Sequence, residues 1–334
     1  MKAAVLHSPK NIQLQEVEMP ALNTGQIRIK LQSVGICGSD VHLYLGHRVL
    51  SEPTILGHEG IGWVEEVGEA VEGFEVGQRV LVEPNVACGK CRYCLSGRGN
   101  ICVNKKVIGV NAPGCFAEYL SLEASHCWKI PSEISDEDAV CVEPLAVAVH
   151  ALACSRIKAG QKIAVFGLGA IGLLLTQLAI SKGFEVFVKD LNKEKEQFAE
   201  QIGACILPSN EQLAQFMLEN EIEAIFDCVG VAQATNLILE TAPRGSEIVL
   251  VGLANEPCSF VPLRIAREEI RILPSIIYHH PADFQETINL IKSGQVKPSK
   301  IISHRFTLDN FLEAITLASS GNATKVIIDI AHPL

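Results

Sequence analysis

The pattern of hydrophobic and polar positions changes along the chain near Ala159 and Gly160. Before this point, short apolar runs such as residues 26–31 and 77–83 are separated by Gly, Pro and Asn, which is typical of short β-strands joined by turns. After it, apolar runs alternate with segments of helical periodicity, at residues 163–167, 171–182, 184–189, 193–202, 224–228 and 247–252. This alternation predicts a doubly wound parallel sheet.

A last segment follows the run of predicted strands and helices. It has helical patterns at residues 283–291 and 308–318 and a strand pattern at residues 325–330. We expect this segment to fold back on the first half of the chain. The chain has 334 residues, against ~100–200 for one ordinary domain, so two domains are expected.

Composition and charge narrow the possible partners. The 28 Lys and Arg against 38 Asp and Glu give a net charge of −10, and the sequence contains no basic stripe that could neutralise a phosphate backbone. Nucleic acid and anionic membranes are therefore not expected as partners.

The apolar stretch at residues 163–180 contains three glycines, Thr176 and Gln177, so it indicates a buried strand leading into a helix, not a membrane span. The N-terminal residues lack the apolar run of a secretory signal, which predicts a cytoplasmic chain with its twelve cysteines as thiols.

Four of these cysteines are clustered. Cys88, Cys91, Cys94 and Cys102 are separated by two, two and seven residues. This spacing can place four thiolates around one tetrahedral Zn²⁺, in a structural site with no open position. An iron–sulfur cluster is the alternative, although no second cysteine set and no Pro after the last cysteine is present.

A second group of metal-binding residue types lies in glycine-rich segments. Cys37 occurs in GICGSDVH, and His58 and Glu59 precede several glycines that allow the backbone to turn tightly. A thiolate, an imidazole and a carboxylate would leave the fourth position of a zinc ion open for substrate, as in catalytic sites. Glu143 is followed by Pro144, which disfavours helical conformation at Glu143 and could direct that carboxylate to the same site as a fourth or exchanging ligand.

Three polar residues near Cys37 could support this site. Asp40 could accept a hydrogen bond from His58 and fix its tautomer. Ser39 and His42 could form a proton relay, with the hydroxyl beside the alcohol and the imidazole releasing the proton to solvent.

The motif GxGxxG follows the predicted strand at residues 163–167. Gly167 permits the tight turn, Gly169 lets the backbone approach a pyrophosphate, and Gly172 lets the helix pack on the sheet. Asp190 ends the next predicted strand and can bind the ribose hydroxyls while repelling a 2′-phosphate, which favours NAD over NADP. Lys189 and Lys195 oppose this preference because either could approach a phosphate. The predicted cofactor-binding residues are Gly167, Leu168, Gly169, Ala170, Ile171, Gly172, Asp190 and Lys195. A flavodoxin-like sheet without cofactor is the alternative.

These three motifs, in this order, resemble the zinc-dependent medium-chain alcohol dehydrogenase family over essentially the whole chain. The stretch GHEGIGWVEEVGEAV at residues 57–71 is similar to the family's zinc signature, and the four-cysteine loop and GLGAIG follow at similar spacing. The resemblance implies an α/β fold with a GroES-like β-rich catalytic domain at residues 1–148 and 284–334 and a Rossmann NAD-binding domain at residues 149–283. It also implies an active site in the cleft between them and association into dimers or tetramers.

The resemblance also implies roles for individual residues. Cys37, His58 and Glu59 correspond to catalytic zinc ligands, Ser39 and His42 to the relay, and Glu143 to the carboxylate near the zinc. The simple-alcohol branch has a cysteine where Glu143 stands, so the sequence EPLAVAVHA is more similar to the sorbitol, polyol and threonine dehydrogenases. An Arg-Tyr pair of the sorbitol branch is replaced by Ile277 and Tyr278, so Tyr278 is the expected substrate contact and smaller or more apolar alcohols become possible.

The expected function is therefore oxidation of a secondary alcohol or polyol by NAD⁺, with two Zn²⁺ per chain and a small alcohol as partner. Three alternatives remain: an L-threonine or other small-alcohol dehydrogenase, a non-catalytic regulator that binds zinc and NAD, and a zinc-free quinone reductase. The presence of Cys37, His58 and Glu59 argues against the last of these.

Overall fold

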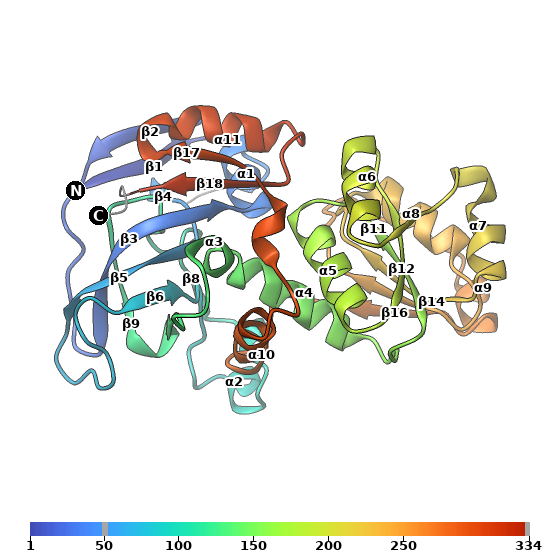
Figure 1. The fold of residues 1–334 in the computed structure, drawn as a ribbon, viewed down its shortest axis with the longest axis horizontal. Coiled ribbons are helices and arrows are strands. Elements are labelled where there is room, and N and C mark those ends of the chain that lie inside the picture. Colours follow the sequence, from blue (N-terminus) through green and yellow to red (C-terminus); the bar gives the residue numbers. More distant parts are fainter. Residues whose placement is uncertain (49–52, 331–334) are drawn as a thin grey trace. The chain divides into compact units, whose positions relative to one another are not determined.

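The computed structural model describes residues 1–48 and 53–330, and the chain divides into two compact units (Figure 1). Unit 1 consists of Met1–Glu143 together with the segment that begins at Ser299, and unit 2 is Pro144–Pro298. The domain boundaries expected after residues 148 and 283 fall inside two helices, α4 (Val142–Cys154) and α10 (Ala282–Lys292). The structural division instead falls near the start of α4 and after the end of α10.

Unit 1 is rich in short strands, as the turn-forming residues predicted. Its strands are β1 (Lys2–Ser8), β2 (Asn11–Glu16), β3 (Gln26–Ile36), β4 (Thr54–Ile55), β5 (Glu59–Val67), β6 (Arg79–Val82), β7 (Asn85–Val86), β8 (Lys106–Val107), β9 (Tyr119–Glu123), β10 (Cys127–Lys129), β17 (Ile302–Thr307) and β18 (Lys325–Asp329). Its helices are α1 (Gly38–Leu45), α2 (Arg92–Leu95), α3 (Asp136–Ala139) and α11 (Phe311–Ser319).

The long strand β3 organises unit 1. A seven-stranded sheet has the order β10-β6-β5-β3-β18-β17, and β9 also pairs with β3. β18 runs antiparallel to β3, with Val326 opposite Ile36, so the strand predicted at residues 325–330 does return to the first half of the chain. The prediction was wrong for residues 283–291, because α10 belongs to unit 2. Its buried face packs there, with the ring of Phe284 edge-on against Tyr278.

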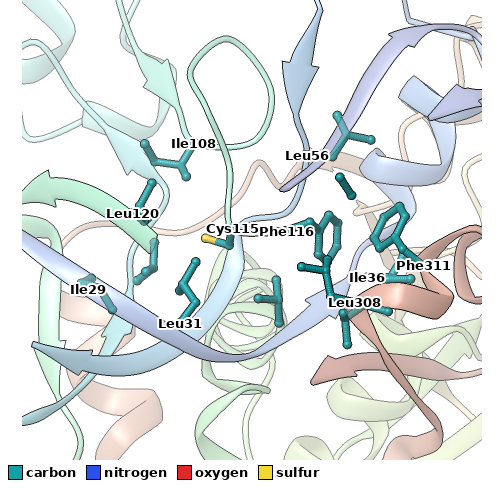
Figure 2. Packing of buried hydrophobic residues seen from close by; sticks show 14 of the residues in the cluster. Ile29, Leu31, Ile36, Leu56, Ile108, Cys115, Phe116, Leu120, Leu308 and Phe311 are labelled. Carbon is teal, nitrogen blue, oxygen red and sulfur yellow. The ribbon is translucent and has the colours of Figure 1, made fainter. Parts of the chain in front are cut away.

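The core of unit 1 follows from the alternation of side chains along β3. Ile27, Ile29 and Leu31 are fully buried, whereas the residues between them are partly exposed. The ring of Phe116 lies 4.6 Å from that of Phe311 in α11, so this helix packs against the same core (Figure 2). Each such side chain contributes about 1.5–3 kcal/mol through burial, and this packing holds the C-terminal segment of unit 1 on the sheet.

Unit 2 is the predicted doubly wound parallel sheet. Its strands are β11 (Lys162–Phe166), β12 (Glu185–Lys189), β13 (Cys205–Ile206), β14 (Ile222–Asp227), β15 (Glu247–Leu250) and β16 (Arg271–Pro274). Its further helices are α5 (Ala170–Ser181), α6 (Lys193–Gln201), α7 (Asn210–Glu219), α8 (Ala232–Thr241) and α9 (Pro262–Arg267). The order is β13-β12-β11-β14-β15-β16 with all pairs parallel.

The strand order of unit 2 reverses direction between β11 and β14, which creates the point where doubly wound folds bind ligands. Helices α5 and α6 lie on one side of the strands and α8 on the other (Figure 1). The apolar stretch at residues 163–180 forms β11 and most of α5. Within the described ranges, none of the helices combines the length and apolarity needed to cross a membrane.

Candidate functional site

Pairing of β3 with β5 assembles the first candidate metal site. Gly35 lies opposite Glu59 in this pair, so Cys37, just beyond the end of β3, comes close to His58 and Glu59 at the start of β5. The Cys37 thiol, one ring nitrogen of His58 and one carboxylate oxygen of Glu59 all lie within 4.8 Å of one another. His58 and Glu59 are buried, and Cys37 is partly exposed. The structure therefore brings together the three residues that the sequence grouped.

Asp40 holds the two segments that carry these ligands. It is fully buried, and its carboxylate accepts hydrogen bonds from the backbone N–H of Cys37 at 2.9 Å and of Gly57 at 3.1 Å. Asp40 also caps the N-terminus of α1. The expected hydrogen bond to His58 is not formed, because Nδ1 of His58 lies 3.6 Å from Asp40 Oδ1, beyond hydrogen-bonding distance. The backbone bonds occupy this carboxylate, which interacts with His58 through charge.

The donor set fits a zinc ion. Burial lowers the pKa of His58, but the charges of Asp40 and Cys37 outweigh it and raise this pKa well above its ordinary value. The buried Nδ1 of His58 has no hydrogen-bond partner within the described part of the chain. Imidazole, thiolate and carboxylate are the ligand types of catalytic zinc, and three protein ligands leave one position for substrate. A cation here would compensate the two neighbouring acidic ligands and take the place of the imidazole proton.

Lys325 is part of this site, although the sequence pattern did not indicate a role for it there. Its ammonium forms an ion pair with Glu59 and donates to the carbonyl of Ile36 at 3.1 Å. The side chain is 1% exposed. A Cβ atom on Gly35 would lie 2.0 Å from Glu59 Oε2 and 2.8 Å from Lys325 Cε, so only glycine fits beside this pair. The one sequence feature that could have indicated a buried Lys325 is its position at the start of an otherwise apolar strand.

Glu143 lies nearby but outside the set of three ligands. It is 6% exposed, and this burial raises its pKa to about 7, although the positive charge of His58 acts in the opposite direction. The expectation that Pro144 keeps Glu143 out of a helix was wrong, since Glu143 is the second residue of α4. Proline is tolerated in the first turn of a helix, where the missing N–H would have no acceptor.

The two residues proposed for proton transfer occupy different environments. The Ser39 hydroxyl lies 3.4 Å from Nε2 of His58 and is partly exposed. His42 is exposed on α1, with its Nδ1 3.2 Å from Nδ1 of His47. Burial and the charge of His47 lower the pKa of His42, so this imidazole readily gives up a proton near neutral pH. Ser39 is thus next to the metal ligands, and His42 faces solvent.

The four clustered cysteines form the second candidate metal site. Their thiols approach one another at 3.4 Å for Cys91 and Cys94, 3.8 Å for Cys91 and Cys102, and 3.9 Å for Cys88 and Cys94. Zn–S bonds of about 2.3 Å in a tetrahedron place sulfur atoms ~3.8 Å apart. These separations fit a single ion, whereas a cluster of several irons would need more room between the thiols. A backbone N–H lowers the pKa of Cys91 to about 6, which favours the ligating thiolate.

We expect Cys94→Ser to lower the free energy of unfolding by at least about 3 kcal/mol, or roughly 6–12 °C in Tm, because the loop loses its tetrahedral ion. Turnover per folded molecule should change less than about twofold, since a closed site does not meet substrate. Differential scanning calorimetry and active-fraction kinetics check this, with exposed Cys205→Ser as the control. Loss of turnover at unchanged Tm would contradict the structural assignment.

The glycine loop of unit 2 has the geometry that its motif predicted. Gly167 has φ of 87° and donates to the Lys189 carbonyl at 2.8 Å. A Cβ on Gly172 would lie 1.8 Å from the Gly167 oxygen, so the helix can pack this closely only with glycine. A Cβ on Gly169 would meet no atom within 4 Å. This residue is the N-cap of α5, which begins with Ala170, so open space adjoins the first N–H groups of the helix, the groups that suit a phosphate.

Asp190 fixes the backbone of the glycine loop. Its carboxylate accepts hydrogen bonds from the backbone N–H of Leu168 at 2.6 Å and of Asn192 at 2.8 Å. The ammonium of Lys189 bonds to the Pro208 carbonyl at 2.6 Å, which occupies one of the two cations considered for a 2′-phosphate. Lys195, in α6, is partly exposed.

Tyr278 belongs to unit 2 and is 2% exposed. Its ring lies 4.7 Å from that of Phe284 in an edge-on arrangement. The residue follows the end of β16 by four positions.

Comparison with known proteins follows the same division of the chain. The description "Alcohol dehydrogenase GroES-like domain" matches residues 23–132, and "Zinc-binding dehydrogenase" matches residues 170–293. The starvation-sensing protein RspB of Escherichia coli K12 is 33% identical, over 95% of each chain. The sorbitol dehydrogenase of Bombyx mori is 30% identical, over 99% of each chain. The crystal structure of RspB from E. coli CFT073, complexed with NADH, has a TM-score of 0.92 at 31% identity and covers 99% of each chain.

Proposed function

The chain belongs to the zinc-dependent medium-chain alcohol dehydrogenase family, and we propose that it oxidises a secondary alcohol or polyol to the ketone, with NAD⁺ as the hydride acceptor. One observation carries the proposal: the ligand atoms of Cys37, His58 and Glu59 lie within 4.8 Å of one another, an open three-ligand set. The same chain contains a complete glycine loop with Asp190 bonded to its backbone. A metal centre for an alcohol and a loop for a dinucleotide together favour hydride transfer.

The roles of the chain's own residues follow from their positions. When bound, zinc supplies a Lewis acid for the alcohol oxygen, and NAD⁺ supplies the hydride acceptor. Asp40 holds the backbone that presents Cys37 and His58. Ser39, beside Nε2 of His58, accepts the alcohol proton and passes it toward His42, which releases it to solvent. The loop at Gly169 holds the pyrophosphate at the N-terminus of α5.

The substrate class follows from two positions. Glu143 and Pro144 occur where the polyol and threonine branch has the same pair, and sorbitol dehydrogenase is among the similar proteins. Ile277 replaces the arginine of the sorbitol branch, so the site has one fewer group for a highly hydroxylated chain. We propose that short diols and secondary alcohols are better substrates than sorbitol, with Tyr278 as the contact that remains.

A substrate panel tests this function. Zinc-loaded protein is incubated with NAD⁺ and sugar alcohols, short diols, secondary alcohols or L-threonine, and NADH absorbance is recorded; Cys37→Ser serves as the inactive control. Turnover of a secondary alcohol or polyol supports the proposal, and a response to L-threonine alone would replace it with threonine oxidation. If the protein binds zinc and NADH but oxidises none of these substrates, it is a non-catalytic regulator.

We expect NAD⁺ to be used much better than NADP⁺, and Asp190→Ala to raise KM for NAD⁺ by at least about 10-fold. The variant loses charge-assisted ribose hydrogen bonds of about 1.5–3 kcal/mol each and the bond that positions Leu168. KM for NADP⁺ should fall relative to that for NAD⁺, because charge repulsion is relieved.

Asp190→Asn is the matched variant for this test, because it keeps a hydrogen-bond acceptor for Leu168 and removes only the charge. Steady-state kinetics with both cofactors provide the measurement. If the unmutated enzyme used both cofactors equally, Lys195 would outweigh Asp190.

A further inference from the structure

A cysteine, a histidine and an aspartate form a hydrogen-bonded chain in unit 2, whereas both candidate metal sites belong to unit 1. His150 and Cys154 lie one turn apart in α4, and Asp283 lies in the first turn of α10. Nδ1 of His150 is 2.9 Å from Asp283 Oδ2, and Nε2 is 3.7 Å from the Cys154 sulfur. The function proposed above uses none of these three side chains.

The contacts run from the Cys154 thiol to the His150 imidazole and on to the Asp283 carboxylate, which is the arrangement found in sites with an activated thiol. Such a site needs a thiol within reach of one imidazole nitrogen and a third group that orients the imidazole through the other nitrogen. Asp283 supplies this third group, and its Oδ2 is itself fixed by the backbone N–H of His279 at 2.7 Å. His150 is buried, so solvent competes little for its contacts, whereas Cys154 is partly exposed and can meet a reagent.

The charges of the histidine and aspartate side chains in this chain follow from their contacts. Burial lowers the pKa of His150, but hydrogen bonds to Asp283 and Cys154 outweigh it and raise this pKa to about 9. Burial raises the pKa of Asp283, yet the bonds from His150 and His279 bring it below its ordinary value. The ring of His279 lies 4.6 Å from that of His150, and burial followed by the charge of His150 lowers its pKa. At neutral pH, Asp283 is therefore anionic, His150 cationic and His279 neutral.

We propose that Cys154 is a reactive thiol that forms a mixed disulfide with low-molecular-weight disulfides. The Cys154 proton is held on Nε2 of His150, and the thiolate electron pair forms a bond to one sulfur of the incoming disulfide. The original S–S bond breaks, and its electron pair leaves on the second sulfur, which takes up the proton held on His150 Nε2 and becomes a thiol. One disulfide and one thiol thus yield one mixed disulfide and one thiol, with no further oxidant.

The proposal requires His150, because the position of Cys154 at the C-terminus of a helix disfavours a negative charge on its sulfur. Cys154 is the last residue of α4, and the carbonyl end of a helix carries partial negative charge. An imidazolium 3.7 Å from the sulfur provides the opposite charge. Cys205 offers a comparison within the same unit, since it is more exposed but has no imidazole bonded to its thiol among the described residues.

Site-resolved thiol labelling tests the proposal. The full zinc-loaded chain is incubated with glutathione disulfide, free thiols are alkylated at intervals, and peptide mass spectrometry gives the rate at each cysteine. Bound zinc is measured throughout, so that reaction of the ligand cysteines is detected separately. We expect Cys154 to react at least about 10-fold faster than Cys205, and dithiothreitol to reverse the product.

His150→Gln should lower the rate at Cys154 to that of Cys205 and leave the rate at Cys205 unchanged. Should this variant fold poorly by thermal melting, Asp283→Asn provides the second test, because it keeps the thiol and the imidazole but removes the charge that orients them. Equal rates at Cys154 and Cys205 in the unmutated chain would overturn the proposal, as would an unchanged Cys154 rate in a folded His150→Gln protein.

Discussion

Lys325→Met is expected to lower the free energy of unfolding of the zinc-depleted protein by about 3–5 kcal/mol, the loss that follows when one partner of a buried ion pair is removed. Both side chains of the pair with Glu59 are 1% exposed, so water cannot solvate the carboxylate left behind. The Ile36 carbonyl also loses its donor. In zinc-loaded protein the loss should be smaller, because the bound cation compensates the charge of Glu59.

Chemical denaturation of zinc-loaded and chelator-treated protein measures this difference. Lys300→Met is the matched control, since Lys300 is an exposed lysine of the same unit and should change stability by less than about 0.5 kcal/mol. The double variant Lys325→Met/Glu59→Gln should recover part of the loss, because neither charge then remains buried. Equal effects at Lys325 and Lys300 would show that the ion pair contributes nothing to stability.

Glu143→Gln is expected to lower turnover by at least about 10-fold while the four-cysteine site keeps its zinc, the size of effect that follows loss of a group beside a metal's ligands. The substitution preserves the shape of the side chain and removes a negative charge that interacts electrostatically with His58 and Glu59. Turnover and zinc content are measured on the same preparation. If turnover, zinc content and pH profile were all unchanged, the carboxylate would have no part in the site.

The same variant should change how stability depends on pH. The pKa of Glu143 is raised from 4.5 to about 7 in the fold, so the folded state holds this proton more tightly than the unfolded chain. Glu143 therefore contributes fully to the stability of the fold below about pH 4.5, and this contribution is lost as the pH rises toward 7. Above pH 7, zinc-depleted Glu143→Gln should therefore be more stable than the unmutated protein, by up to roughly 3 kcal/mol at ~1.4 kcal/mol per pH unit. Thermal melts of both proteins from pH 5 to 8 provide the comparison.

Groups of residues encoded over short distances in the sequence lie together in the structure as the sequence predicted. The spacing from Cys88 to Cys102 and the glycines from Gly167 to Gly172 each act within one loop, where the residue types needed for a metal or a phosphate are recognisable without a fold. The parallel sheet followed from alternating periodicities, each of which reports on local burial.

Features that depend on which distant segments meet were missed. Lys325 lies 266 residues from Glu59, and its place depends on β18 pairing with β3. Nothing near residue 325 in the sequence identifies the carboxylate it contacts. The apolar period at residues 283–291 predicted a helix correctly, yet an amphipathic pattern does not specify which core receives it. The rule applied to Glu143 is a local preference of the residue before a proline, and it failed because Glu143 and Pro144 lie in the first turn of α4.

The position of β18 has a consequence for biosynthesis. The contact between Lys325 and the Ile36 carbonyl spans 289 residues, which at ~5–20 residues per second leaves roughly 15–60 s between the emergence of the two segments from a ribosome. During this interval residues 33–36 at the end of β3 lack their native partner β18, and an unpaired strand edge can join strands of other nascent chains. All of unit 2 is synthesised within the same interval, and its sheet uses only its own strands. The unit whose first strands are translated first thus completes its fold last. Only then does the buried Lys325 pair with Glu59, beside Cys37 and His58.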